Sequence, residues 1–263
     1  MLAGQGAELA FTYQGESFGR RAKPLAESTG ATIIEPCDVE DFESVRKVFD
    51  KIREQWGKLD FVVHALAFSD RTELKGRYCD TSRANFSRTM EISCFSFTEI
   101  SRLAADLMPD GGSLLTLTYG GSNKVVPCYN VMGVAKAALE ASVRYLASDL
   151  GGKGIRVNAL SAGPMRTLAG AGISDARMLF HYQSENSPMH RTPTLDEVGG
   201  SALYLLSDMS GAVTGEVHMV DCGYNTIFMP SLESIKAATG EETDEEKAKS
   251  ASAASAASSE TVQ

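Results

Sequence analysis

The sequence lacks an excess of positive charge and lacks long apolar runs. Lysine and arginine total 25 residues against 34 aspartates and glutamates, which gives the 263-residue chain a formal net charge of −9. Binding to a nucleic-acid backbone requires clustered positive charge, so we expect no nucleic acid as a partner. No apolar run approaches the roughly 20 residues that cross a bilayer, and no secretion signal opens the chain. We therefore expect no transmembrane segment and a cytoplasmic protein.

The sequence also lacks the cysteine and histidine patterns of disulfide frameworks and metal sites. The five cysteines are odd in number and scattered, without a C-x-x-C pair: Cys37, Cys79, Cys94, Cys128 and Cys222. The four histidines show no metal-ligand spacing: His64, His181, His190 and His218. Reduced thiols and no metal are the expectation, and a lone histidine is more often structural.

Short apolar runs alternate with segments of helical period from residue 8 to residue 225, which is the pattern of a parallel sheet covered by helices. The predicted strands are Glu8–Tyr13, Ala31–Glu35, Leu59–Ala65, Ser113–Thr118, Ile155–Leu160 and Glu216–Asp221. The predicted helices are Phe18–Ser28, Asp41–Gln55, Arg83–Met108, Tyr129–Leu150 and Asp196–Ser207. The expected fold is α/β, a doubly wound parallel sheet of the Rossmann-like type in a single domain.

We expect this domain to span residues 1–235 and an acidic, Ala/Ser-rich disordered tail to span 236–263, because the tail has too little apolar surface to offset the entropy of ordering. Ligands of doubly wound sheets bind outside the carboxyl ends of the strands, so chemistry is expected after Tyr13, Ala65, Thr118 and Leu160. The segment from Met165 to Arg191 is long and poorly periodic, which is typical of a lid over a site.

Tyr129 and Lys136 are the most informative pair. They are seven residues apart, close to two helical turns, so on one helix they share a face. A cation near a phenol lowers the phenol pKa, which would suit a tyrosine that donates or stabilises a proton. Taken alone, the pair is better explained as an aromatic residue at a helix start and a solvated lysine, because such pairs are common.

The surrounding motifs resemble the bacterial enoyl-acyl carrier protein reductases of type I, a divergent branch of the short-chain dehydrogenase/reductases. Residue 132 is Met, so the Tyr-x3-Lys spacing of the ordinary superfamily fails, whereas Tyr119, Tyr129 and Lys136 fit the reductase pattern. Further similar motifs are Tyr-Asn-Val-Met-Gly at 129–133, Arg-Val-Asn-Ala at 156–159, Ser-Ala-Gly-Pro at 161–164 and Arg-Thr-Leu-Ala at 166–169. The resemblance runs from about residue 4 to residue 226.

The resemblance implies NADH-dependent reduction of the trans-2 double bond of an enoyl thioester carried by acyl carrier protein, in fatty-acid biosynthesis. Hydride goes to the β-carbon, and negative charge develops on the thioester oxygen as an enolate. By resemblance, Tyr129 donates a hydrogen bond to that oxygen, which accelerates the step. Lys136 holds the nicotinamide ribose and biases the phenol, and Tyr119 lines the pocket, although Tyr119 could also be a packing residue.

Cofactor contacts carry over by resemblance to Gln14, Asp38, Val39, Ala65, Leu66, Lys136, Met165, Arg166 and Thr167. Neither an acid nor an arginine adjoins Gln14 to select the adenosine ribose, so the preference for NADH over NADPH rests on the resemblance. Asp38 matches the adenine-binding position, yet an aspartate before a helix is also a good N-cap. Thr167 would donate its hydroxyl to a phosphate.

Substrate contacts carry over to Ser69, Tyr119, Met132, Leu179 and Phe180. We expect the acyl group to lie under residues 168–182, where five apolar residues could cover it or simply pack a surface helix: Leu168, Ile173, Met178, Leu179 and Phe180. Residues 166–191 have a surplus of one positive charge, which does not define a carrier docking surface. The resemblance implies a homotetramer, with contacts through Asp196–Asp221.

The glycine-rich phosphate turn expected after a first strand is not found at the start of this sequence. Gly4 and Gly6 precede a strand instead of following one, which is typical of a helix end. We expect a strand, its turn and most of a helix, roughly 25 residues, to be missing ahead of Met1. In the sheet, the missing strand would lie between the strands Glu8–Tyr13 and Leu59–Ala65. A longer cellular protein is one hypothesis. The alternatives are a truncated, non-catalytic copy that acts in oligomers and a short-chain reductase that acts on a carbonyl.

Overall fold

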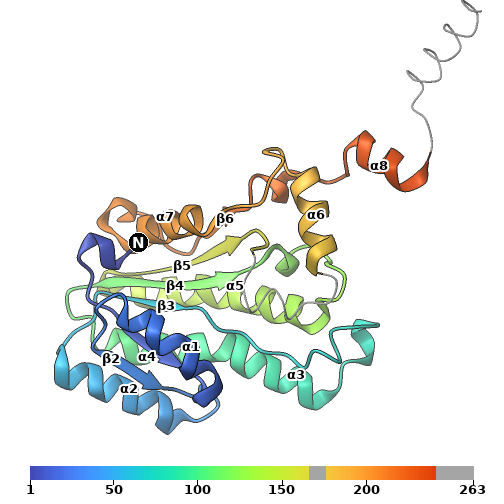
Figure 1. Cartoon of the computed structure of the whole chain (residues 1–263). Helices are drawn as coiled ribbons and strands as arrows, with labels where there is room; N and C mark the ends of the chain where they lie inside the picture. Colours follow the sequence, from blue (N-terminus) through green and yellow to red (C-terminus); the bar gives the residue numbers. More distant parts are fainter. Residues whose placement is uncertain (166–175, 241–263) are drawn as a thin grey trace, which may run out of the picture.

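The computed structural model describes residues 1–165 and 176–240, and it confirms the predicted α/β fold (Figure 1). Six strands pair in parallel, and each overlaps a predicted strand. The strands are β1 (Ala10–Tyr13), β2 (Ile33–Pro36), β3 (Phe61–His64), β4 (Gly112–Thr118), β5 (Ile155–Ala162) and β6 (Val217–Val220). Strands of β-branched and aliphatic residues buried on both faces, such as β4 and β5, are typical of parallel sheets.

The described strands form two separate sheets. One has the order β1-β2 and the other the order β3-β4-β5-β6. No described strand therefore lies between β1 and β3, which is where the sequence predicts a gap.

Helices cover both faces of the strands. The helices are α1 (Gly15–Glu27), α2 (Phe42–Gln55), α3 (Arg83–Met90), α4 (Ser96–Ala105), α5 (Asn130–Leu150), α6 (Ala176–Asn186), α7 (Leu195–Leu206) and α8 (Leu232–Thr239). One hydrophobic cluster joins α2, α4 and α5 to β2, β4 and β5. A second cluster packs α7 on the other face of β4 and β5. The predicted bounds of α1, α2, α5 and α7, which follow from segment length and the spacing of apolar residues, agree with the observed bounds to within a few residues.

Three predictions about helices are wrong or incomplete. The predicted helix Arg83–Met108 is interrupted by a π-helical turn, Glu91–Phe95, between α3 and α4. Part of the predicted loop between Met165 and Arg191 is the helix α6, and α8 extends past residue 236, where the sequence predicts the tail to begin. Residues 241–263 lie outside the described part of the chain. No helix of the described residues is long and apolar enough to cross a membrane.

Two polar side chains of β5 hold the segment that leads into β6. Asn158 is fully buried, donates to the carbonyl of Val213 at 2.9 Å and accepts from the backbone of Glu216 at 3.0 Å. Arg156 donates to the carbonyls of Leu205 and Ser207 near the end of α7, at 2.8 and 3.1 Å. These bonds explain why an Arg-x-Asn pair occurs in an otherwise apolar strand.

Replacing Asn158 by Ala is expected to lower the free energy of unfolding by about 1–3 kcal/mol, because it removes two hydrogen bonds of a fully buried side chain. Denaturant unfolding measures this, with the exposed Asn123→Ala as the control. Equal stability of the two variants would show that the Asn158 bonds do not hold this segment.

Candidate active site

The carboxyl ends of the parallel strands carry most of the residues predicted to act in binding and catalysis. Gln14 follows β1, Asp38 and Val39 follow β2, and Ala65 and Leu66 follow β3. Tyr119 follows β4, and Met165 follows β5. Strands that run parallel within a sheet end at one edge, so each sheet gathers its share of these residues there.

Tyr129 lies at the N-cap of α5, where the backbone is under strain. It is 7% exposed, and its neighbours Cys128 and Asn130 have φ of 57° and 36°, in the left-handed region that L residues rarely adopt. The Asn130 side chain holds this conformation by donating to the carbonyls of Glu73 and Gly76, at 3.2 and 3.4 Å. The strained turn fixes the direction in which the Tyr129 ring leaves the backbone.

The Tyr129 ring packs tightly against the turn after β4. The rings of Tyr119 and Tyr129 meet edge to face, with centroids 5.3 Å apart. A Cβ atom on Gly121 would lie 2.5 Å from Tyr129 Cδ1, so only glycine permits this contact. Tyr129 and Met132 share a buried cluster with Leu74 and Val131, which Tyr119 flanks. The structure thus brings together Tyr119, Tyr129 and Met132, as the resemblance implies.

Lys136 is buried beneath the end of β4. It is 6% exposed, and its Nζ donates to the carbonyl of Leu117 at 2.8 Å. Burial lowers the pKa of Lys136 to about 8, although Cys94 and Glu140 favour its charged form. Glu140 is also buried and accepts a 2.6 Å hydrogen bond from the hydroxyl of Thr118. Two buried side chains one helical turn apart thus bind α5 to the last residues of β4.

The pKa of Tyr129 is shifted in the opposite direction from the one that the spacing of Tyr129 and Lys136 predicts. Burial raises the pKa of the Tyr129 phenol well above its usual value, and the charges of Tyr119 and Glu140 raise it further. Burial also raises the pKa of Tyr119, with contributions from Tyr224 and Asp221. The expectation from spacing neglected desolvation, which disfavours the phenolate. Tyr129 is therefore held as a neutral phenol, which is a hydrogen-bond donor.

Sequence reasoning missed a buried polar network next to Lys136. His64, at the end of β3, is 2% exposed, and its ring nitrogens lie 2.9 Å from the hydroxyls of Thr116 and Ser96. Burial lowers the pKa of His64 to about 3, and the charge of Lys136 contributes. Glu140 follows Lys136 by four residues, so the sequence could have placed it on the same face of the helix. No sequence signal indicates that His64 contacts two hydroxyls on other elements.

The remaining predicted residues have different surroundings. Ser69 is buried and accepts from the hydroxyl of Thr89 at 3.0 Å, beside Asn85. Asp38 is not an N-cap, because the cap of α2 is Asp41; the Asp38 carboxylate accepts from the backbone of Glu40 at 3.1 Å. The half-buried Leu179 and Phe180 lie on α6. Arg166, Thr167, Leu168 and Ile173 lie outside the described residues.

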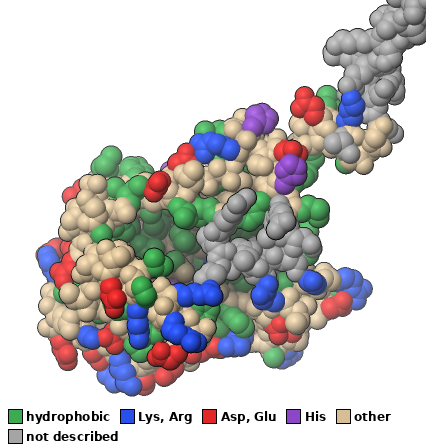
Figure 2. Space-filling view, in the orientation of Figure 1, with side chains coloured by type: hydrophobic (Ala, Val, Ile, Leu, Met, Phe, Trp, Pro, Cys, Tyr) green, Lys and Arg blue, Asp and Glu red, His purple; other side chains and the backbone are tan. Residues whose placement is uncertain are grey.

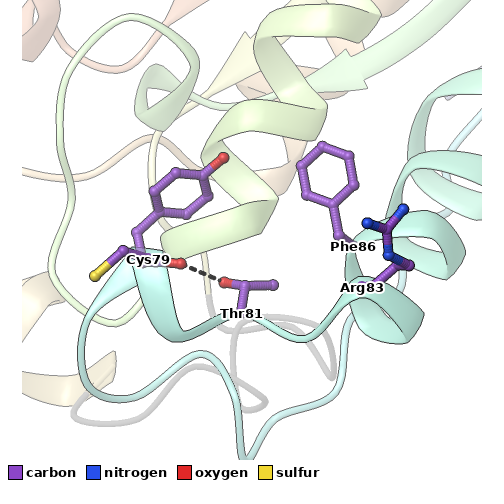
Figure 3. Close-up of a pocket in the computed structure, with 5 residues that line it drawn as sticks. Cys79, Thr81, Arg83 and Phe86 are labelled. Atoms are coloured by element: carbon purple, nitrogen blue, oxygen red, sulfur yellow. Dashed lines mark hydrogen bonds between the residues drawn. The ribbon is translucent and has the colours of Figure 1, made fainter.

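A separate surface pocket lies where the short helical turn Tyr78–Asp80 leads into α3 (Figure 3). Tyr78, Cys79, Thr81, Arg83 and Phe86 line it, and the Thr81 hydroxyl donates to the carbonyl of Tyr78 at 2.7 Å. None of the residues predicted for catalysis, cofactor or substrate is among the five. Among the described residues, no group of three or more His, Cys, Asp or Glu is placed to hold a metal ion.

Comparison with known proteins decides the family. Residues 1–225 match the family model described as Enoyl-(Acyl carrier protein) reductase. The chain belongs to this family. It is 68% identical over 237 residues to the NADH-dependent enoyl-acyl carrier protein reductase 2 of Rhizobium meliloti, which covers 90% of this chain and 88% of the relative. It is 54% identical to the corresponding Rickettsia typhi reductase, with 86% and 87% covered.

Solved structures of enoyl-acyl carrier protein reductases share the fold. The Anaplasma phagocytophilum enzyme, solved in complex with NAD, has a TM-score of 0.84 and 59% identity over 88% of each chain. The Candidatus Liberibacter asiaticus enzyme has a TM-score of 0.85 and 59% identity, with 88% of this chain and 89% of that chain covered. These two comparisons confirm the reductase fold that the sequence predicts.

Gly121→Ala is expected to lower the free energy of unfolding by about 1–3 kcal/mol, because the new methyl group must displace the Tyr129 ring or the turn that holds it. Gly120→Ala is the matched control, since a Cβ atom there meets nothing within 4 Å. Denaturant unfolding compares them. If Gly121→Ala unfolds like Gly120→Ala, the site is not packed as described.

The buried His64 is expected to make the free energy of unfolding decrease at acidic pH. Its pKa of about 3 in the folded protein lies below the usual 6.5, so the unfolded chain binds more protons between these values. The neutral ring makes its full contribution to the free energy of unfolding above pH 6.5. This contribution is lost as the pH falls toward 3, by at most about 1.4 kcal/mol per pH unit. His64→Gln is expected to flatten the curve of unfolding free energy against pH in this range.

The exposed His181→Gln on α6 is the control for the His64 experiment, and it is expected to keep the unmodified slope. Unfolding titrations from pH 7 to pH 4 measure both variants. An unchanged slope in His64→Gln would mean that the ring takes up a proton without cost in the folded protein.

Proposed function

We propose that this chain reduces the trans-2 double bond of enoyl thioesters on acyl carrier protein, with NADH, in fatty-acid biosynthesis. Membership of the reductase family and 68% identity to an NADH-dependent relative support the reaction and the cofactor. The observation that carries the proposal in this chain is the buried side chain of Tyr129, a neutral phenol that packs in one cluster with Tyr119 and Met132. Such a donor matches the negative charge that develops on a thioester oxygen.

The described residues fit the nicotinamide end of the cofactor. A lysine ammonium has three donors, and Lys136 Nζ uses one on the carbonyl of Leu117. No hydrogen bond to the Tyr129 hydroxyl is found among the described residues, and this oxygen is not one of the fully buried atoms without a partner, so it is accessible to a ligand. The Tyr129 hydroxyl and the remaining Lys136 donors are thus available for contacts with a ligand. NADH, when bound, supplies hydride to the β-carbon of the substrate.

Tyr129 is proposed to donate its hydrogen bond to the thioester oxygen. Charge grows on this oxygen as the double bond is reduced, so the bond is stronger in the transition state than in the ground state. Burial keeps the proton on the phenol until it is needed, and the edge of Tyr119 limits the rotation of the ring. Tyr119 would therefore orient the donor and line the substrate pocket.

Lys136 is proposed to hold the nicotinamide ribose hydroxyls. With a pKa of about 8, the ammonium is mostly protonated near neutral pH and can donate to them. The other proposed cofactor contacts follow the strand ends: Gln14, Asp38, Val39, Ala65, Leu66 and Met165, together with Arg166 and Thr167. Substrate contacts are assigned to Ser69, Met132, Leu179 and Phe180 in addition to Tyr119.

The partner protein, the oligomeric state and the cellular location proposed for this chain are those of its family. Acyl carrier protein is the partner that presents the substrate. A homotetramer in the cytoplasm is the proposed state, which sedimentation of the purified chain can test.

One assay separates this proposal from its alternatives. NADH oxidation is followed with a crotonyl thioester and, in parallel, with a 3-ketoacyl thioester. Oxidation with the enoyl substrate alone is expected, because the seven-residue offset between Tyr129 and Lys136 differs from that of the short-chain reductases that act on carbonyls. Activity on the ketoacyl substrate alone would favour a carbonyl reductase. Absence of both activities would favour a non-catalytic copy that acts in oligomers.

Tyr129→Phe is expected to reduce kcat by about 10²–10³-fold, the usual effect of removing one donor from an oxyanion site. The dissociation constant of NADH, measured by fluorescence, should change much less, because the lysine contact remains. Tyr145→Phe is the control, since Tyr145 lies on the same helix and is 76% exposed. Equal losses of turnover and NADH binding in Tyr129→Phe would assign Tyr129 a structural role.

A further inference from the structure

The segment 70–82, which leads from β3 toward α3, is tied to the turn that carries Tyr129. The Asn130 side chain donates to the carbonyl of Glu73 at 3.2 Å. Leu74 is 8% exposed and belongs to the same buried cluster as Tyr129. The inner side of this segment therefore forms part of the wall of the proposed site, and its outer side forms surface next to that site.

The exposed surface of this segment and of α3 is positively charged. Residues 70–88 contain five lysines and arginines against three aspartates and glutamates, whereas the whole chain has a formal net charge of −9. All five cations are exposed: Arg71, Lys75, Arg77, Arg83 and Arg88. Figure 2 shows Lys and Arg side chains at the right of the view, where Figure 1 places the segment that leads into α3. A positive surface on an otherwise acidic chain steers an acidic partner to one place.

Hydrogen bonds within the segment occupy its acids. The three carboxylates accept at 2.6 to 2.9 Å from neighbouring residues: Asp70 from Thr72, Glu73 from Ser82 and Asp80 from Arg77. Among the described residues, Lys75 and Arg83 form no ion pair. These two charges are therefore available to a partner protein.

An aromatic cavity lies beside Arg83. It encloses about 380 Å³ and is lined by Tyr78 and Phe86, which are 47% and 38% exposed. In Figure 3, Arg83 and Phe86 project from α3, across from the turn that contains Cys79. Tyrosine, phenylalanine and arginine are enriched at protein interfaces, where they anchor the partner in well-packed cavities. The cavity therefore suits an apolar side chain that is flanked by acidic groups.

The proposed reaction supplies a partner that fits this surface. Its substrate is a thioester on acyl carrier protein, and the arm that holds the thioester contains an anionic phosphodiester. This arm has to enter the site beside Tyr129, so the carrier has to dock on surface that adjoins the site. The segment 70–82 packs against Tyr129 on its inner side and carries exposed cations on its outer side.

We propose that acyl carrier protein docks on the exposed face of residues 70–88. Lys75 and Arg83 bind acidic side chains of the carrier, and the cavity between Tyr78 and Phe86 takes one of its apolar side chains. This inference rests on the proposed function, because it takes the carrier to be the source of the substrate. It adds the surface on which the carrier is recognised, which differs from the cover of the acyl group expected at residues 168–182.

Binding is measured directly, by fluorescence anisotropy of a labelled carrier protein that holds a crotonyl group. Lys75→Glu combined with Arg83→Glu is expected to raise the dissociation constant by about tenfold or more, because like charges then face the carrier. Phe86→Ala leaves the charge unchanged and is expected to raise it by about threefold or more, because it removes a wall of the cavity. Melting temperatures check that these variants are folded.

Turnover separates docking from chemistry. With the crotonyl carrier protein as substrate, the KM of the Lys75→Glu, Arg83→Glu variant is expected to rise by about tenfold or more, with little change in kcat. With the crotonyl thioester of N-acetylcysteamine, which has no carrier, kcat/KM is expected to stay within about twofold of the unmodified chain. Equal losses with both substrates would contradict a docking role.

Lys47→Glu combined with Lys153→Glu is the matched control. It makes the same change in net charge at two exposed residues, on α2 and after α5, and is expected to bind the carrier like the unmodified chain. The docking proposal is overturned if the two double variants bind the carrier equally, or if the unmodified chain does not bind it. Absence of NADH oxidation with both substrates would instead contradict the proposed function, and the binding measurement would still decide the docking surface.

Discussion

The burial of Lys136 beneath β4 is the constraint on which the site depends. A buried ammonium is costly unless it is bonded, and here the carbonyl of Leu117 and the nearby carboxylate of Glu140 offset that cost. The bond from Thr118 to Glu140 adds a second connection between α5 and the same strand end. Since α5 is fixed at two points, its first turn cannot shift, and Tyr129 is held against the turn after β4.

The sequence predicts this framework well because its signals are local. Apolar runs identify all six strands, and the spacing of Tyr129 and Lys136 places both at the start of α5. The pKa of Tyr129 could not be predicted, because it depends on desolvation by side chains from distant segments, such as Leu74. The π-helical turn at Glu91–Phe95 lacks a sequence signal for a related reason. Its Ser93 bonds both backbone groups of Phe68 at 2.9 and 3.0 Å, a contact between different elements.

Tyr129 and the strand β3 differ in how completely they are buried. At Tyr129, the ring packs closely against Gly121, and burial of the side chain keeps the phenol neutral. At Val63, an apolar strand remains exposed beside unpaired backbone groups, although its neighbour β4 is buried. The first arrangement is complete within the described residues, whereas the second lacks a neighbour.

The central claim is that burial keeps Tyr129 a neutral donor at every pH at which the protein works. Tyrosine labelled with ¹³C at Cζ reports ionisation directly in an NMR titration, and Tyr129→Phe identifies the resonance. We predict that the Tyr129 signal stays at the position of the neutral phenol beyond pH 10, where an ordinary tyrosine ionises. Ionisation of Tyr129 below pH 10 would contradict the account and would restore a phenolate favoured by Lys136.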